Sequence, residues 1–492
     1  MSRDLISNSL QSMIQPVPHS EPRRALALDA LRGLAILLMV FSGRIPFGVL
    51  PDWMYHAQVP PPDHVFSPNL PGITWVDLVF PFFIFTMGAA IPLALSRRLE
   101  QGTSLWRIIL SILERGFLLA GFAIYVQHIR PWSMPATAEG RATVLSLTLC
   151  LIGFLLLFPV LARLPGRWNV WTRRGIRAAG WIGAMVLMMV WRFKDGSGFS
   201  LYKSDIIILV LSNVYVTGAI IWLFTRDKLF VRVGLLGVLA GLILSSTADG
   251  WIKPFWLDSP LPWLFELRFQ KYLFLIIPGT VIGDMILNWM KAPAGEVRPA
   301  GSWTSTQLMA TALMMILLNI VLVVGLKARW TLETTIAAAV LCGIAWVLLR
   351  SPTTSTEVLM MRMFQWGTFL LFIGLSLEPF EGGIKKDHST FSYYFVTGGL
   401  ATFVLIALII VIDVFQHRRA LNLLIESGQN PLIAYAGVNS LVPPVLGLLS
   451  LDLLIERITP TPWLGALRGA FMTYLVALAA SVCTKKKIFL RA

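Results

Sequence analysis

The sequence has few charged residues for its length. Of its 492 residues 14% are Asp, Glu, Lys or Arg, and 56% are hydrophobic. Soluble globular chains average about 25% charged residues. A composition so poor in charge excludes an ordinary soluble domain and indicates a chain that resides mostly in lipid.

The sequence also lacks several patterns that would indicate other classes. Its three cysteines, Cys150, Cys342 and Cys483, lie far apart, so they form neither a metal-binding spacing nor a disulfide pattern, and we expect no metal. No repeat of 20–50 residues and no matched pair of interrupted helices is visible, which weakens the case for a secondary transporter. The opening stretch Met1–Arg24 has no apolar core, so we expect no cleavable secretory signal.

Apolar runs recur from end to end, each long enough to cross about 30 Å of hydrocarbon. In lipid every backbone polar group must be satisfied internally, so these runs are expected to be helices. Two of them, Ala178–Trp191 and Thr335–Leu349, are short and are either re-entrant or merged with a neighbour. The other predicted spans are Leu26–Ser42, Ile73–Leu95, Ile108–Gln127, Thr143–Leu161, Asp205–Phe224, Val233–Ala248, Tyr272–Trp289, Thr306–Leu326, Leu359–Leu377, Phe391–Ile412, Pro431–Leu451 and Leu464–Val482. The sequence therefore predicts an all-α, polytopic transmembrane bundle of 10–14 spans.

The basic residues behind the net charge of +15 lie mostly in the loops. Lys and Arg concentrate on one set of alternate loops, which predicts that both termini are cytoplasmic. The densest cluster, residues 163–177, and the basic end, residues 484–492, are expected to meet anionic lipid headgroups, and no nucleic acid is expected. Residues 1–24 would form a cytoplasmic tail, and residues 25–483 a single transmembrane domain.

An outer loop, residues 44–72, carries two of the six histidines, His56 and His64. It leads into the second span, where Asp77 lies about one turn inside. Ionisable groups at this depth are costly and often functional. A histidine titrates near neutral pH, and a carboxylate on one ring nitrogen leaves the other free to act as a base. The alternatives are a histidine at headgroup level and a carboxylate favoured by the helix dipole.

Four segments then resemble a known family. They are the stretch from Arg24 to Gly33, the stretch from Pro71 to Pro81 with His56-Ala57 before it, KDHSTFSY at residues 386–393, and GQNPLIAY at residues 428–435. In this order they resemble the heparan-α-glucosaminide N-acetyltransferase family, membrane enzymes with lysosomal and bacterial members. The resemblance covers roughly residues 24–96 and 380–450.

The resemblance implies acetyl transfer across a membrane. Acetyl-CoA would bind from the cytosolic side, and its acetyl group would pass to an amino sugar on the far side. The family's catalytic histidine corresponds best to His56, with Asp77 as its orienting partner. Because this loop is longer than the family pattern, His64 is the alternative base.

Further residues receive roles from the same interpretation. Arg32 with Asp29 would contact coenzyme A phosphates, although the two are equally well explained as an ion pair at a helix end. Lys386 would meet an acidic sugar or remain a solvated charge. Asn430 and Tyr435 would close the substrate pocket or cap and anchor a helix.

The predicted function is thus an integral acyltransferase of the bacterial inner (plasma) membrane, acting on a sugar amine or hydroxyl. One alternative is a sugar or glycolipid transporter or flippase that uses the same His and Asp residues for proton coupling. Another is a non-catalytic membrane partner in a glycan-processing complex. Gly237 and Gly241 form a small-residue face that weakly favours a homodimer.

Overall fold

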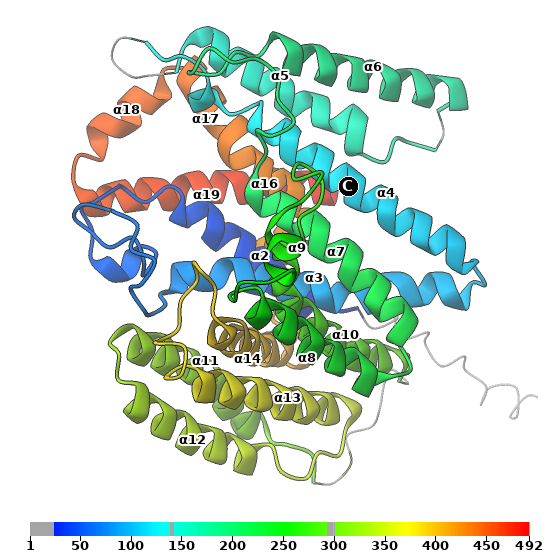
Figure 1. Cartoon of the computed structure of the whole chain (residues 1–492), viewed down its shortest axis with the longest axis vertical. Helices are drawn as coiled ribbons and strands as arrows, with labels where there is room; N and C mark the ends of the chain where they lie inside the picture. The colour runs from blue at the N-terminus through cyan, green and yellow to red at the C-terminus, as the bar shows by residue number, and fades with distance from the viewer. Residues whose placement is uncertain (1–23, 138–141, 167, 293–298, 300, 492) are drawn as a thin grey trace, which may run out of the picture.

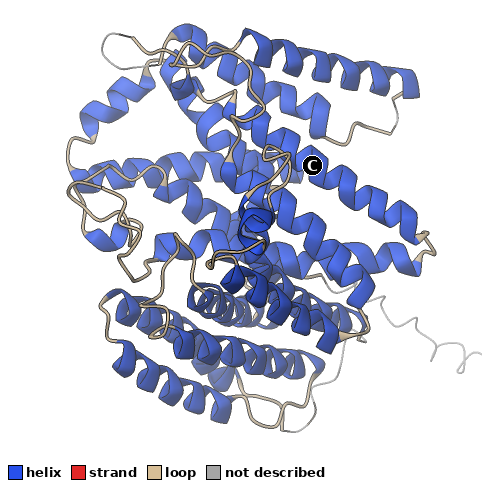
Figure 2. Ribbon diagram, in the orientation of Figure 1, coloured by secondary structure: helices blue, strands red, loops and turns tan. Residues whose placement is uncertain are grey.

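The computed structural model describes residues 24–137, 142–166, 168–292, 299 and 301–491. Within these residues the chain is built from helices and loops, with no strand (Figure 2). The α-helices are α2 (Leu26–Ser42), α3 (Trp75–Glu100), α4 (Leu105–Gln127), α5 (Val144–Leu161), α6 (Val170–Val190), α7 (Ile206–Thr225), α8 (Leu229–Ser245), α9 (Ile252–Leu257), α10 (Leu273–Lys291), α11 (Ser305–Lys327), α12 (Thr331–Leu348), α13 (Ser355–Leu377), α14 (Phe391–Ile409), α15 (Asn422–Gln429), α16 (Pro431–Ser440), α17 (Val442–Leu448), α18 (Leu451–Ile458) and α19 (Pro462–Lys485).

Eleven helical segments in the described residues are long and apolar enough to cross a bilayer. They are α3, α4, α5, α7, α11, α12, α13 and α19, together with the composite segments Leu267–Lys291, Phe391–Val414 and Pro431–Leu448. The prediction of an all-α polytopic bundle with 10–14 spans is confirmed. Three predicted spans fall short of a full crossing by length or composition: α2 and α8 have 17 residues each, and α6 carries three arginines in its first half.

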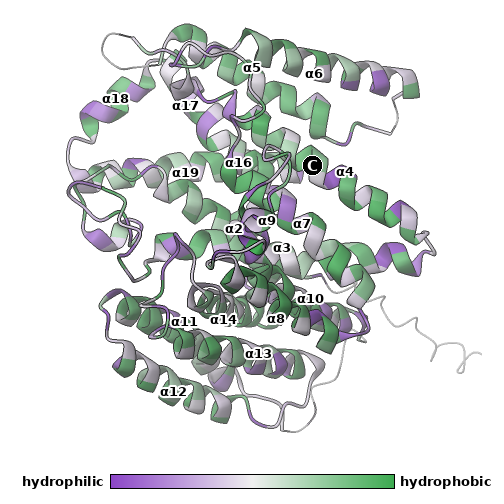
Figure 3. Cartoon of the chain, viewed as in Figure 1, coloured by the Kyte–Doolittle hydropathy of each residue, from purple (hydrophilic) through white to green (hydrophobic). Residues whose placement is uncertain are grey.

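The helices run roughly parallel to one another, with loops gathered at their two ends (Figure 1). α2 and α3 lie in the middle, the α5–α6 hairpin lies at one edge, and the α11–α12 hairpin at the other. Apolar residues cover the helix shafts, and hydrophilic residues concentrate at helix ends and loops (Figure 3). We call the end that holds residues 44–72 and the start of α3 the His56 face, and the end where α3 finishes the Arg97 face.

The backbones of α2 and α15 approach each other closely at two glycines. A Cβ added to Gly33 would lie 1.8 Å from the carbonyl oxygen of Leu424, and one added to Gly428 would lie 1.8 Å from that of Asp29. Only glycine permits this approach. The contact brings α15, from late in the chain, against α2 from its beginning.

Gly237 and Gly241, the pair of small residues on α8, have open space beside their Cα atoms. A Cβ added to Gly237 or Gly241 on α8 would meet no atom within 4 Å in the described structure. The two glycines therefore do not support packing within the chain, and the homodimer stays a prediction.

Candidate functional site at the start of α3

Asp77 is fixed by the way α3 begins. Thr74 is the N-cap, its side chain accepts from the backbone N–H of Val76, and Asp77 completes a capping box. One oxygen of Asp77, Oδ2, accepts from the backbone N–H of Thr74 at 3.0 Å and of Ala57 at 3.0 Å. The bond from Thr74 satisfies a donor that a helix start otherwise leaves unpaired, and the bond from Ala57 ties the carboxylate to the loop that carries His56. The helix-start interpretation of Asp77 therefore holds, and it also fixes the carboxylate in one orientation.

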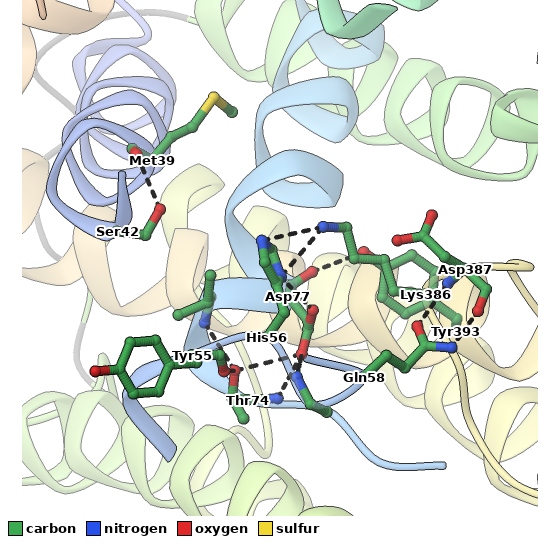
Figure 4. A network of polar contacts seen from close by, with 12 residues as sticks. Met39, Ser42, Tyr55, His56, Gln58, Thr74, Asp77, Lys386, Asp387 and Tyr393 are labelled. Atoms are coloured by element: carbon green, nitrogen blue, oxygen red, sulfur yellow. Dashed lines mark hydrogen bonds and ion pairs between the residues drawn. The ribbon is translucent and has the colours of Figure 1, made fainter. Parts of the chain in front are cut away.

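The other oxygen of Asp77 faces His56. Oδ1 lies 2.7 Å from Nδ1 of the His56 ring (Figure 4). The Asp77 side chain is 2% exposed, while that of His56 is 38% exposed. Since the carboxylate accepts the Nδ1 proton, the lone pair of neutral His56 lies on Nε2, on a ring that solvent reaches. The site thus has the arrangement of a general base with an orienting carboxylate.

Lys386 comes from the loop between α13 and α14 and completes the cluster. Its Nζ lies 3.2 Å from Nδ1 and 3.4 Å from Nε2 of His56. The α14 side of the cluster is closed by Tyr393, whose hydroxyl donates to the backbone carbonyl of Asp77 at 2.7 Å. Residues more than 300 positions apart in sequence therefore meet at one point.

Two contacts tie the Lys386 loop to the loop that carries His56. Gln58 is 3% exposed, and its amide accepts from the backbone N–H of Asp387 at 2.8 Å and donates to the Asp387 carbonyl. It also donates to the carbonyl of Pro68 at 3.0 Å. Further along, the N–H of Gly72 donates to the carbonyl of Ile384 at 2.7 Å. The position of Lys386 is therefore set by backbone contacts on either side of it.

His64 lies apart from this cluster. Its ring packs 3.9 Å, centroid to centroid, from Phe47 and 4.5 Å from Tyr55. Its Nε2 is buried without a hydrogen-bond partner among the described residues. The structure therefore brings His56, and not His64, to the Asp77 carboxylate.

A cavity of about 850 Å³ extends from the Arg97 face toward His56. Along α3 its wall runs from Phe83 to Gln101, about 27 Å at 1.5 Å per residue. Phe83 is six residues, about 9 Å, from Asp77 on the same helix. The cavity wall also includes Met39 of α2, which Figure 4 shows together with the His56 cluster.

Arginines line this cavity toward the Arg97 face. The described lining contains Arg32, Arg97, Arg98, Arg115 and Arg491. Arg97 and Arg98 are exposed in the last turn of α3, so their guanidinium groups are accessible to an anion. Arginine forks bind phosphate oxygens in pairs, and this end of the cavity has the donor set that phosphates require.

Arg32 and Asp29, unlike the exposed Arg97 and Arg98, are held by contacts within the protein. Nη1 of Arg32 lies 3.4 Å from Oδ1 of Asp29 and 3.4 Å from the carbonyl of Gly428, and Nη2 donates to the carbonyl of Thr86 at 3.3 Å. Asp29 also accepts from Gln429 at 3.2 Å. Arg32 lies on the cavity wall, whereas Asp29 does not belong to the described lining.

Asn430 and Tyr435 lie away from His56. The Asn430 amide donates to the carbonyl of Ile488 at 2.7 Å and accepts from the N–H of Leu490 at 3.2 Å, which ties down the end of the chain. The Tyr435 hydroxyl donates to Asp205 at 2.7 Å, and its ring lines the large cavity. Asn430 thus anchors residues 488–490, and Tyr435 forms part of the wall of the large cavity.

A smaller cavity, about 360 Å³, lies on the His56 face beyond the Lys386 loop. Its described lining includes Asn69, Lys271, His388 and Tyr394. The Tyr394 side chain is 1% exposed, and its hydroxyl has no hydrogen-bond partner in the described part of the chain. The described linings of the two cavities include none of His56, Asp77 and Lys386, so the cluster lies between the cavities and not in either wall.

The family described as a domain of unknown function, DUF5009, matches residues 24–286, more than half of the chain. The chain belongs to the DUF5009 family. The DUF5009 match contains His56, Asp77, Arg97 and Arg98 and ends before the loop that supplies Lys386.

Two curated relatives confirm the resemblance inferred from the motifs. The chain is similar to heparan-α-glucosaminide N-acetyltransferase of Homo sapiens, with 35% identity over 106 residues, and to that of Mus musculus, with 32% identity over 107 residues. The matches cover 21% and 22% of this DUF5009 chain. They span only 14% of the length of each relative.

Two parts of this candidate site were not predicted from the sequence. Arg97 and Arg98 form a basic pair at the end of an apolar span, which was visible but indistinguishable from an orientation signal. Gln58 gave no signal, because its role depends on contacts with Pro68 and Asp387.

Proposed function

We propose that this chain is a membrane acetyltransferase. It takes an acetyl group from acetyl-CoA bound in the large cavity and transfers it to an amino or hydroxyl group of a sugar at the His56 face. His56 acts as the general base, and Asp77 orients it. The cytoplasmic side would be the Arg97 face, as the loop charges predict.

The His56–Asp77 contact is the observation that carries this proposal. A 2.7 Å contact from Nδ1 to a carboxylate held by two backbone N–H groups leaves Nε2 as the proton acceptor. A positioned base of this kind contributes typically 10²–10⁴-fold to proton transfer. The proton removed is that of the acceptor amine or hydroxyl as it attacks the thioester carbonyl.

The large cavity supports a donor that enters from the Arg97 face. Its arginine-lined end suits the phosphates of coenzyme A, and its course along α3 suits an extended thioester arm. Arg97, Arg98 and Arg491 would hold the phosphates, because Arg32 is already engaged with Asp29 and two backbone carbonyls.

The smaller cavity supports an acceptor at the His56 face. Lys271 and His388 offer donors beside the buried Tyr394 hydroxyl, and Phe391 and Tyr394 supply aromatic surface. A sugar ring needs both kinds of contact. Lys386 lies in the loop that separates this cavity from His56.

The test uses the full chain purified in detergent or nanodiscs. Saturable binding of acetyl-CoA, and thiol release that depends on a glucosamine-type acceptor, are expected. The absence of both, with the protein shown to be folded, would overturn the proposal. Acceptor flux across sealed vesicles without acetylation would instead favour the transporter alternative.

A further inference from the structure

We infer that Lys386 stabilises the negative charge that develops on the acetyl carbonyl oxygen, and that Gln58 is the positioning residue that holds Lys386 there. The inference rests on the proposed acetyl transfer and assigns two of its parts. Lys386 thereby gains a role in the chemical step itself, in place of contact with an acidic sugar.

Lys386 Nζ lies close to both ring nitrogens of His56. Nδ1 donates to Asp77, so it has no lone pair to accept from Lys386, although Nζ is only 3.2 Å away. Nε2 is 3.4 Å from Nζ. The ammonium group therefore lies about equally close to both ring nitrogens, one of which is Nε2, where the acceptor must deliver its proton.

The transfer step creates two opposite charges that need stabilisation. The acceptor nitrogen or oxygen attacks the thioester carbon, its proton passes to Nε2 of His56, and the carbonyl π electrons move onto oxygen. One positive charge, the imidazolium, and one negative charge, the oxyanion, appear together. Asp77 is in place to stabilise the imidazolium. Lys386 is the cation in place to stabilise the oxyanion.

The step then reverses these charges. The oxyanion collapses to a carbonyl, the carbon–sulfur bond breaks, and the leaving thiolate takes the proton from the His56 imidazolium. His56 returns to its neutral form and Lys386 keeps its charge throughout. No oxidant, metal or further reactant is needed.

Gln58 holds the loop that carries Lys386. Its carbonyl accepts from the Asp387 N–H at 2.8 Å, and its amide donates to the carbonyls of Asp387 and Pro68. These contacts involve the residue next to Lys386. A glutamate at position 58 would keep the shape but lose both donated bonds.

Lys386→Met is the primary test, in a wild-type enzyme already shown to bind acetyl-CoA and to turn over. Removing one oxyanion donor costs about 10²–10³-fold in kcat. We expect such a loss, with KM for donor and acceptor within about threefold of the wild type, and partial recovery in Lys386→Arg. The matched control is Lys253→Met, an exposed lysine paired with Asp249, which should retain wild-type rates.

Gln58→Glu tests the positioning role through non-additivity. It should lower kcat about tenfold with unchanged donor binding, and Lys386→Met/Gln58→Glu should be no slower than Lys386→Met alone, as for residues that act as one unit. An independent loss in the double variant would overturn the role of Gln58. A raised acceptor KM with unchanged kcat in Lys386→Met would overturn that of Lys386. Failure of the proposed function is distinct, because there the wild type itself would not turn over.

Discussion

Nδ1 of His56 lies 2.7 Å from Oδ1 of Asp77, and the other oxygen of that carboxylate accepts from the backbone N–H groups of Ala57 and of Thr74, the N-cap of α3. A single buried side chain therefore serves two purposes. It begins the helix and it orients the ring. Because the carboxylate is fixed by the backbone, the ring it holds is fixed as well, and this rigidity is what a transfer site requires.

Substitutions of the two histidines of the outer loop should have different effects. His56→Ala should lower acetyl transfer about 10²–10⁴-fold, because it removes the base. His64→Ala should keep the rate and lower the melting temperature, because His64 packs against Phe47 and Tyr55. Thiol release and thermal unfolding measure the two effects, and equal activity of both variants would contradict the assignment.

Asp77→Asn should impair both catalysis and stability. Without the charge the amide no longer fixes the Nδ1–H tautomer of His56, and a fall in kcat on the order of 10²–10⁴-fold is expected. Loss of a carboxylate that accepts two backbone N–H bonds should cost about 1–3 kcal/mol.

The chain offers a matched control for the stability part of that change. Thr354 and Glu357 form another capping box, at the start of α13. Glu357→Gln should lower stability similarly and leave kcat close to the wild-type value. A comparable loss of kcat in Glu357→Gln would indicate that Asp77 acts only through folding.

Substitution of Arg97 and Arg98 should weaken the binding of acetyl donors that carry nucleotide phosphates and spare donors that lack them. The double substitution Arg97→Met/Arg98→Met removes two exposed cations from the cavity mouth. Charge-assisted bonds contribute about 1.5–3 kcal/mol each, so the loss of two should raise KM for acetyl-CoA by at least about 100-fold. KM for acetyl-pantetheine, which lacks the nucleotide phosphates, should change little.

Arg226→Met provides the comparison for these arginines, since Arg226 is a surface residue paired with Asp227 outside the cavity lining. It should leave both KM values unchanged. An equal rise in KM for both thioesters in Arg97→Met/Arg98→Met would place the phosphates elsewhere.

The α2–α15 contact predicts that one methyl group added at Gly33 lowers the stability of the protein. Gly33→Ala would set a Cβ 1.8 Å from the carbonyl oxygen of Leu424, and the helices must separate. Overpacking of this kind typically costs about 1–3 kcal/mol or more. Gly241→Ala, where a Cβ meets nothing within 4 Å, should be neutral. Melting temperatures of the two variants check this difference.

Several features of this protein follow from the sequence by itself. Low charge and recurring apolar runs predicted the all-α membrane bundle, because lipid permits few alternatives to helices. The loop that leads into Asp77 was also recognisable, because a carboxylate beside hydrocarbon needs a compensating partner. The motif order added the family resemblance.

Only the tertiary structure decided which residues meet. Spacing along the chain left His56 and His64 as alternatives, and the fold brought His56 to Asp77 while His64 packed against aromatic rings. It also joined Lys386 to His56 and set the Asn430 side chain against Ile488. These pairings link distant segments. They depend on helix packing and backbone contacts, which local sequence patterns do not predict.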